Sequence, residues 1–233
     1  MSKRGRRSKN DRLHIEGILY ILRTGIPWRD LPDIFGKWST VYKRFQRWSE
    51  EGLWQHMLTA LNDLYSDDEY LMIDSSIMRI HQDGSNPKGG QMRQAMGKSR
   101  GGLSTKVHMA CDALGYPLSC VITGGVRHDA TQAKTLLQRH LKENSYALLD
   151  AGYDSDELRS IVDTNRSTSV IAYRKNRIII PEFDKHLYKE RHKIENLFQK
   201  LKRYRRIATR YEKTHSHFKA MVTFASILLY VRF

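Results

Sequence analysis

The sequence predicts an α/β protein in which a mixed five-stranded sheet is flanked by helices and preceded by a small helical domain. Two patterns lead to this expectation. From about residue 69 onward, apolar or alternating runs of strand length appear, and the later ones alternate with helical patterns. Before that point the periodicity is helical, and all four tryptophans fall there. We therefore assign residues 1–65 to the helical domain and residues 66–233 to the α/β domain.

Residues 13–61 are expected to form helices around a small core of their own. Large apolar rings for that core come from Trp28, Trp38, Trp48 and Trp54. A break at residues 25–27 ends the first helix, a short helix follows at 29–35, and a third helix begins after Gly36. Within the third helix, apolar residues recur at helical spacing and face inward: Val41, Phe45 and Trp48.

The third helix also carries basic residues on its other faces, namely Lys43, Arg44 and Arg47. A basic third helix after a tight break is typical of a helix-turn-helix, whose last helix enters the major groove of DNA. A helical bundle with a solvated charged face is the alternative interpretation. Residues 1–11 form a basic arm ahead of these helices.

Five segments of the second domain have the length and composition of strands: residues 71–81, 104–112, 116–123, 145–149 and 169–173. Helical patterns occupy residues 130–141, the stretch after Asp154, residues 186–202 and the segment after Thr214. Residues 82–103 form a polar, glycine-rich and basic loop that either closes over a phosphate backbone or is flexible. This order of elements is that of an RNase H-like fold, with the first three strands antiparallel and the last two parallel to the first.

The charge balance favours a polyanionic partner. The formal net charge is +15 and the isoelectric point is about 9.9, so nucleic acid or an anionic membrane surface is expected. The longest apolar run, residues 220–231, is shorter than the ~20 residues of a bilayer-spanning helix and is interpreted as a buried helix. Two cysteines without a CxxC pair, and no apolar leader segment, favour a reduced, cytoplasmic protein.

Three acidic residues lie where a metal-dependent nuclease needs its ligands. Asp74 interrupts the apolar run of the first strand, Asp150 ends that of the fourth, and Glu195 lies in a basic helix near the end. Two divalent ions about 4 Å apart can activate a water and stabilise the leaving oxygen of an in-line displacement. Magnesium prefers oxygen ligands. Carboxylates that converge beyond the strand ends therefore predict a Mg²⁺ site for phosphodiester chemistry on DNA.

The helix expected at residues 186–202 has the most informative spacing. Its polar stripe has intervals of 3, 4 and 7 residues and consists of Tyr188, Arg191, Glu195 and Lys202. An adjacent apolar stripe can seat the helix on the sheet: Ile194, Leu197, Phe198 and Leu201. The carboxylate suits a metal, whereas the arginine and the lysine suit phosphate. A surface helix with an i, i+4 Arg–Glu pair is the plainer alternative.

A dense basic cluster continues beyond that helix. It includes Lys202, Arg203, Arg205 and Arg206, with Arg210 and Lys213 following. Such a run is expected to track a DNA backbone. A solvated charged surface is the alternative.

Two further acidic residues resemble helix caps. Asp129 and Gln132 have the spacing of a capping box, and Asp154 and Glu157 repeat it. Asp129 could instead form an acid–base pair with His128, but a cap is the simpler expectation. Neither aspartate is therefore assigned to the catalytic set.

Together these residues resemble bacterial insertion-sequence transposases of the DDE class, in the group that carries a Y-(2)-R-(3)-E-(6)-K signature. The signature is met at every spacing by Tyr188, Arg191, Glu195 and Lys202. Other matching stretches are residues 22–32, 97–106, 150–154 and 205–211, so the similarity covers nearly the whole chain. Many members of the group carry a longer segment before the region of Trp28.

The resemblance implies a transposase that recognises inverted repeats at the ends of its element. It implies Mg²⁺ or Mn²⁺ held by Asp74, Asp150 and Glu195, nicking that frees a 3′-OH, and attack of that 3′-OH on target DNA. It also implies that Tyr188, Arg191 and Lys202 contact the terminal phosphates. The partner is then double-stranded DNA, the active form a homodimer on DNA, and the location a bacterial nucleoid. A repressor without chemistry and a nuclease without strand transfer are the competing functions.

Overall fold

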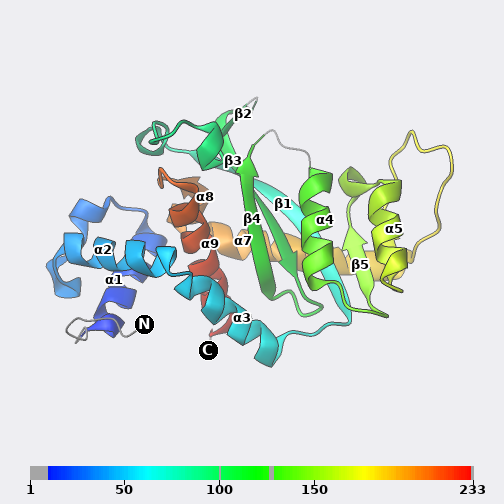
Figure 1. The fold of residues 1–233 in the computed structure, drawn as a ribbon, viewed down its shortest axis with the longest axis horizontal. Helices are drawn as coiled ribbons and strands as arrows, with labels where there is room; N and C mark the ends of the chain where they lie inside the picture. Colours follow the sequence, from blue (N-terminus) through cyan, green and yellow to red (C-terminus); the bar gives the residue numbers. More distant parts are fainter. Residues whose placement is uncertain (1–9, 100, 126–128, 232–233) are drawn as a thin grey trace.

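The computed structural model describes residues 10–99, 101–125 and 129–231, and a seven-stranded mixed sheet lies at the centre of this part (Figure 1). The strands are β1 (Tyr70–Ile80), β2 (Gly97–Ser99), β3 (Gly102–Cys111), β4 (Pro117–Gly124), β5 (Tyr146–Leu149), β6 (Thr168–Ile171) and β7 (Thr209–Arg210). β3 pairs antiparallel with β1 and β4, whereas β5 runs parallel to β1 and to β6. The expected RNase H-like arrangement of five strands is confirmed.

Two short strands add to the five that the sequence predicts. β2 lies in the segment expected to be a loop and pairs with the start of β3. β7 pairs with Arg79 and Ile80 at the end of β1, whereas β5 pairs with β1 only over residues 70–72. In the described part of the chain, residues 73–78 of β1 therefore pair with β3 on one side and with no strand on the other. Asp74 lies in this unpaired edge.

Helices cover the sheet and form the N-terminal region. They are α1 (Asp11–Thr24), α2 (Trp38–Glu50), α3 (Leu53–Tyr65), α4 (Asp129–His140), α5 (Asp156–Thr164), α6 (Lys185–Tyr188), α7 (His192–Lys202), α8 (Arg205–Ala208) and α9 (His215–Tyr230). The helix expected at residues 186–202 is interrupted, because a 3₁₀ turn at Lys189–Arg191 separates α6 from α7. Such turns are common at helix ends. No helix within the described ranges is long and apolar enough to cross a bilayer.

The two faces of the sheet carry different helices (Figure 1). Alternate side chains of a strand point to opposite faces. Leu71 and Ile73 of β1 pack in a hydrophobic cluster with residues of α4 and α5. Met72 and Met78 pack in a second cluster with residues of α7 and α9. Because Asp74 lies two residues beyond Met72, it faces the α7 side of the sheet, where Glu195 is located.

The N-terminal helices do not close a core of their own, contrary to expectation. Val41 and Phe45 are fully buried, but they belong to the same hydrophobic cluster as α7 and α9. The ring of Trp54 lies 4.6 Å from that of Phe224 in α9, measured between centroids. Gly25 ends α1 in the left-handed region with φ 73°, and a Cβ at this position would lie 3.1 Å from that of Arg205. A division of the chain at residue 65 remains a prediction.

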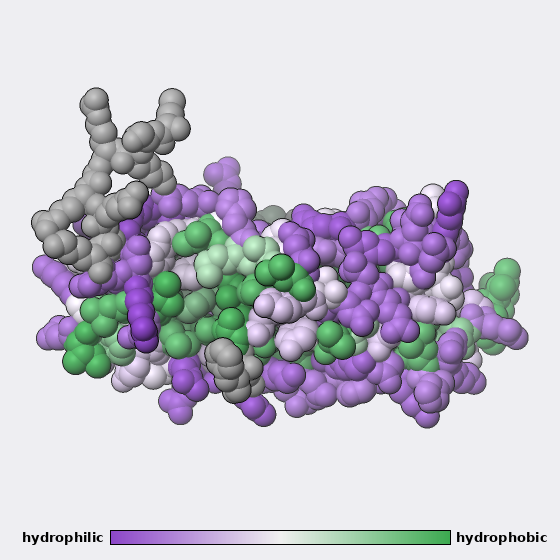
Figure 2. All heavy atoms as spheres, turned by 90° about the horizontal axis from the view of Figure 1, so that it is seen from below, coloured by the Kyte–Doolittle hydropathy of each residue, from purple (hydrophilic) through white to green (hydrophobic). Residues whose placement is uncertain are grey.

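One face of the outer surface is largely hydrophilic. Figure 2 shows polar and charged side chains over much of one face, with apolar patches between them. Exposed large apolar residues include two in the segment between β6 and α6, where Ile178 is 97% and Ile179 is 80% exposed.

Candidate active site

Asp74 lies on β1, and Asp150 directly follows the neighbouring strand β5. β1 and β5 run parallel with Met72 opposite Leu148, and each aspartate lies two residues beyond that pair. Asp150 directly follows β5, at the carboxyl end where open α/β sheets place their sites. Glu195 lies in the first turn of α7, on the face of the sheet toward which Asp74 points. The fold therefore brings the two aspartates together and directs the helix with the glutamate to the same region.

The charges of the three acids act on one another. Burial raises the pKa of Asp74 to about 6, and the negative charges of Asp150 and Glu195 contribute to this rise. The amide of Ser75, which donates to Oδ1 of Asp74 at 2.7 Å, and the charge of Arg191 act in the opposite direction. Glu195 is thus close enough to Asp74 to affect its ionisation, although no contact joins them in the described hydrogen bonds and ion pairs.

Arg191 forms the direct contact with Asp74. Its Nη2 lies 3.3 Å from Oδ2 of Asp74. Its Nη1 donates to the phenol oxygen of Tyr188 at 3.3 Å, and the guanidinium carbon lies 5.5 Å from the centre of the Tyr188 ring. Arg191 is 8% exposed. Tyr188 and Arg191 therefore share one side of the helical segment with the acids, as the spacing predicts, despite the 3₁₀ turn between them.

Asp150 is held by the turn that follows it. Its Oδ1 accepts a hydrogen bond from the amide of Gly152 at 2.8 Å. A Cβ at position 152 would lie 2.9 Å from the same oxygen, closer than real Cβ atoms approach. Arg174 braces the turn, because its Nη2 donates to the carbonyl of Gly152 at 2.8 Å and its Nε donates to that of Ala151 at 3.2 Å. A side chain at position 152 would therefore displace the carboxylate.

The acids fit a divalent cation by their chemistry but are not gathered around one. Among the residues that the structure describes, no group of three or more His, Cys, Asp or Glu side chains is close enough to hold a metal ion. Carboxylate oxygens are the ligands that Mg²⁺ and Mn²⁺ prefer. The guanidinium of Arg191 lies against Asp74 instead. Assembly of Asp74, Asp150 and Glu195 around a cation thus requires side-chain movement.

The sequence-predicted basic residues divide into exposed and buried groups. The exposed ones are Lys43, Arg47, Lys202, Arg203 and Arg205. Lys202 lies seven residues after Glu195, about 10 Å along a helix with a rise of about 1.5 Å per residue. Arg44 is partly buried, with its Nη1 3.6 Å from Asp11 and its guanidinium 5.5 Å from the Trp48 ring centre. Arg206 is 5% exposed, so we leave it out of the DNA-backbone surface.

The two expected caps have other partners. Ser155, not Asp154, caps α5, because its hydroxyl accepts from the amide of Leu158 at 3.2 Å. Asp154 is buried and pairs with Arg159 and Arg177 at 3.0 and 2.9 Å. The expectation for Asp154 is therefore wrong, and a serine directly before the helix was the signal for the correct cap.

Asp129 belongs to a network that the sequence did not indicate. It is the first residue of α4, and His128 lies outside the described residues. Oδ1 of Asp129 lies 2.9 Å from Nζ of Lys106 and 3.5 Å from Nδ1 of His108. Burial lowers the pKa of His108 to about 4, so this imidazole is neutral at physiological pH. Lys106 and His108 are two residues apart on β3, so they lie on the same face of the sheet. Their contact with Asp129 of α4 depends on the tertiary fold, which the sequence pattern does not predict.

Comparisons with known proteins agree with this architecture. Residues 65–230 match the family described as "Transposase DDE domain", and residues 1–58 match "Putative transposase of IS4/5 family". A Brucella ovis protein named "Putative transposase for insertion sequence element IS6501" is 43% identical over 131 residues, which is 56% of this chain and 100% of that protein. The uncharacterised protein y4sN of Sinorhizobium fredii is 43% identical over 96 residues, 40% of this chain and 75% of that protein.

A solved structure shares the fold. The piggyBac transposase, determined in a synaptic complex with hairpin DNA, superposes with a TM-score of 0.60 at 13% identity. The match covers 97% of this chain and 66% of the piggyBac chain. The family match over most of the chain and the RNase H-like sheet agree with each other. The chain belongs to the bacterial insertion-sequence transposases that carry a DDE domain.

Proposed function

We propose that this chain binds the inverted-repeat ends of an insertion sequence, cleaves DNA at those ends and joins the freed 3′-OH to target DNA. Asp74, Asp150 and Glu195 would hold Mg²⁺ or Mn²⁺. The observation that carries the proposal is the position of Asp74 on β1 and of Asp150 directly after the parallel strand β5, with the charge of Glu195 acting on Asp74.

The bound cations would supply activation of the attacking oxygen and neutralisation of charge on the phosphate. The chain's own residues have complementary tasks. The phenol oxygen of Tyr188 accepts a hydrogen bond from Arg191 and so orients its guanidinium. Arg191 would bind a phosphate oxygen of the DNA. The Gly152 amide fixes one oxygen of Asp150, so the other oxygen is presented to the site.

The exposed basic residues would bind the DNA backbone. Lys202, Arg203 and Arg205 continue from the end of α7, away from the candidate active site along the helix. Contacts of this kind grip the phosphate backbone without reading sequence. Lys43 and Arg47 lie on the exposed face of α2, the helix that the sequence assigns to the major groove. An active homodimer on DNA follows from the need to hold two ends together.

The test is a reaction of the purified full chain with DNA that carries the flanking repeats of its element, in the presence of Mg²⁺. We expect nicks at the repeat ends and, with a pre-cleaved end, covalent joining to a target plasmid. Asp74→Asn should abolish both while leaving end binding within about threefold. Hydrolysis without joining would favour a nuclease. Binding without cleavage by the unsubstituted chain, in Mg²⁺ and in Mn²⁺, would favour a repressor.

A further inference from the structure

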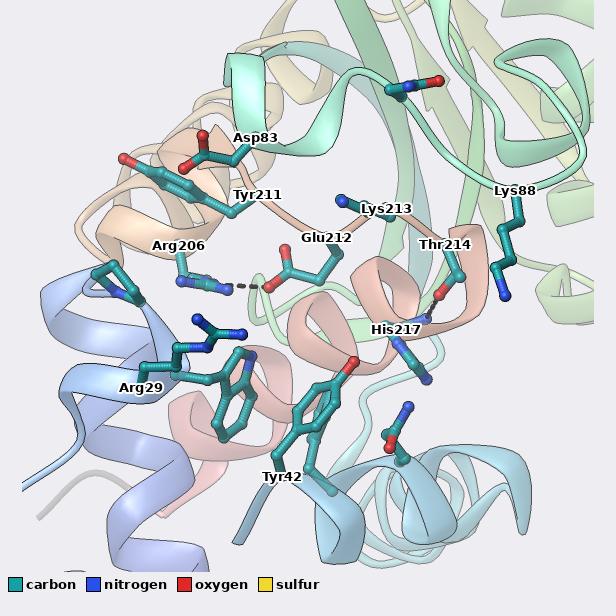
Figure 3. A pocket seen from close by; sticks show the side chains of 15 residues that line it. Arg29, Tyr42, Asp83, Lys88, Arg206, Tyr211, Glu212, Lys213, Thr214 and His217 are labelled. Carbon is teal, nitrogen blue, oxygen red and sulfur yellow. Dashed lines mark hydrogen bonds and ion pairs between the residues drawn. The ribbon is translucent and has the colours of Figure 1, made fainter. Parts of the chain in front are cut away.

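A second site lies between the N-terminal helices and the segment that joins α8 to α9. It is a cavity of about 1080 Å³ (Figure 3), slightly above the range for small-ligand sites, about 300–1,000 Å³. None of the three candidate catalytic acids lines it. Asp83 and Lys88, which follow β1, do line it. Asp74 and Ile80 are six residues apart on β1, about 20 Å at about 3.3 Å per residue, so the cavity is separate from the candidate active site.

Three exposed cations line this cavity, together with the exposed carboxylate of Asp83. Arg29 follows α1, Lys88 lies in the loop after β1, and Lys213 lies before α9. All three are exposed, and Figure 3 shows that they come from different sides of the lining. Three exposed cations from three segments suit a phosphate group, which accepts from several donors at once.

Aromatic rings form much of the wall. Trp28 and Tyr42 lie 5.0 Å apart between ring centroids, and Tyr42 lies 6.3 Å from the imidazole of His217 in an edge-to-face arrangement. All three are half-buried, so parts of their surfaces remain available. Aromatic rings beside cations are the usual platform for an unstacked nucleobase, because every base presents a π-face.

A buried carboxylate forms the floor. Glu212 is 6% exposed, and its Oε1 accepts from Nε of Arg206 at 2.6 Å. Arg206 is fixed in turn by the carbonyl of Ile26, which accepts from Nη1 at 2.7 Å. Oε2 of Glu212 has no hydrogen-bond partner within the described part of the chain. Figure 3 shows this carboxylate among the lining side chains, with one oxygen toward Arg206 and the other directed away from it. A buried acceptor without a donor is costly, so a ligand that brings an N–H would be favoured.

We propose that the cavity binds a single unstacked nucleotide whose base donates an exocyclic amino group to Glu212. The phosphate would lie beside Arg29, Lys88 and Lys213, and the ring would lie against Trp28 or Tyr42. Cytosine, adenine and guanine have such an amino group, whereas in thymine the only ring N–H is flanked by two carbonyl oxygens that the carboxylate repels. In duplex DNA the base must leave the stack to enter the cavity. The proposal rests on DNA being the partner, as proposed above.

The test compares d(CCCCC) with d(TTTTT), each labelled with fluorescein, binding to the full chain in EDTA. The two strands have the same sugar-phosphate backbone, so the ratio of their affinities measures the preference for one base over the other. We expect the cytosine strand to bind at least about tenfold more tightly. Glu212→Gln should bring the ratio close to one. The matched control is Glu157→Gln, which removes one negative charge from an exposed side chain on α5 and should leave the ratio unchanged. Lys213→Ala should weaken the binding of both strands by the same factor.

Equal binding of the two strands by the unsubstituted chain, or a ratio that survives Glu212→Gln, would overturn the proposal. If Glu212→Gln does not fold, photocrosslinking of the unsubstituted chain to a 5-iodocytosine strand replaces it. Crosslinks at Trp28, Tyr42 or Tyr211 support the site, and crosslinks confined to other residues refute it. If the unsubstituted chain cleaves DNA but shows no cytosine preference, the cavity proposal alone is rejected. A preference that persists in a chain without cleavage rejects the catalytic proposal alone.

Discussion

Arg191 and Asp74 form an ion pair at the candidate active site, with 3.3 Å between Nη2 of the arginine and Oδ2 of the aspartate. The side chains are 9% and 19% exposed, so water screens the pair only in part. The arginine supplies positive charge to a carboxylate that burial and two neighbouring acids make less acidic. We infer that, without metal, this guanidinium partly offsets the charge that a divalent cation would neutralise.

Replacement of Arg191 should separate metal binding from catalysis. In Arg191→Gln, Asp74 loses its cationic neighbour, so Mn²⁺ no longer competes with an internal charge. We expect Mn²⁺ to bind up to about tenfold more tightly, whereas DNA cleavage falls about 100-fold or more because the phosphate loses its guanidinium contact. Calorimetric titration with Mn²⁺ and a cleavage assay measure the two effects. Weaker Mn²⁺ binding in a folded Arg191→Gln variant would contradict this role.

The ionisation of Asp74 should appear in the stability of the metal-free chain. Its folded-state pKa is raised to about 6 from an ordinary value of 3.8. Stability linked to the protonated carboxyl is thus fully present below about pH 4 and is lost as the pH rises through about 6. Asp74→Asn should therefore stabilise the chain in EDTA at pH 7.5 by about 1–3 kcal/mol, with a smaller gain at pH 5. Urea unfolding at both pH values measures this. A gain independent of pH, or a destabilisation at pH 7.5, would count against it.

Gly152 should be needed for the position of Asp150 more than for folding. In Gly152→Ala the new Cβ meets Asp150 Oδ1 at 2.9 Å, so the carboxylate must move. We expect cleavage to fall about tenfold to 100-fold, with the melting temperature lowered by only a few degrees. Gly101→Ala is the matched control, because its Cβ meets nothing closer than 4.0 Å. Equal activity of the two variants would show that Asp150 tolerates the displacement.

Arg205 and Arg206 are adjacent in sequence but should behave differently when replaced by alanine. Arg205 is exposed, so Arg205→Ala should weaken DNA binding, reduce the salt slope by about one and leave stability unchanged. Arg206 is buried against Glu212 at 2.6 Å, so Arg206→Ala leaves a buried charge and should cost about 3–5 kcal/mol of stability. DNA binding as a function of salt, and urea unfolding, distinguish the two. A reversal of these effects would contradict the placement of the two side chains.

The sequence predicted the main sheet because buried strands have a recognisable local pattern of apolar residues. β1, β3, β4, β5 and β6 have apolar or alternating runs, and the alternation with α4, α5 and α7 determines which strands are parallel. The short β2 and β7 have no such pattern, since three and two residues are too few to show a period. The 3₁₀ turn at Lys189–Arg191 was missed because helical spacing is nearly the same on both sides of it.

The features that the sequence did not predict depend on contacts between residues that are distant along the chain. Arg206 looks like part of a basic surface in sequence, yet its partner Glu212 and the carbonyl of Ile26 bury it. The carbonyl lies 180 residues away along the chain, and no local pattern marks it. The N-terminal tryptophans likewise join a cluster that includes α9 because Trp54 meets Phe224. Residue type and spacing suggested Asp74 and Asp150 as neighbours, and only strand register could establish that each lies two residues beyond one paired position of β1 and β5.

Iron-directed cleavage of the polypeptide tests most directly whether three distant acids share one cation site. Fe²⁺ would replace Mg²⁺ in the DNA-bound chain, and ascorbate with peroxide would cut the backbone near the bound metal. We expect cuts near Asp74, Asp150 and Glu195 together, and their joint loss in Asp74→Asn. Cuts near only one of these residues, or cuts that persist in Asp74→Asn, would contradict a shared site.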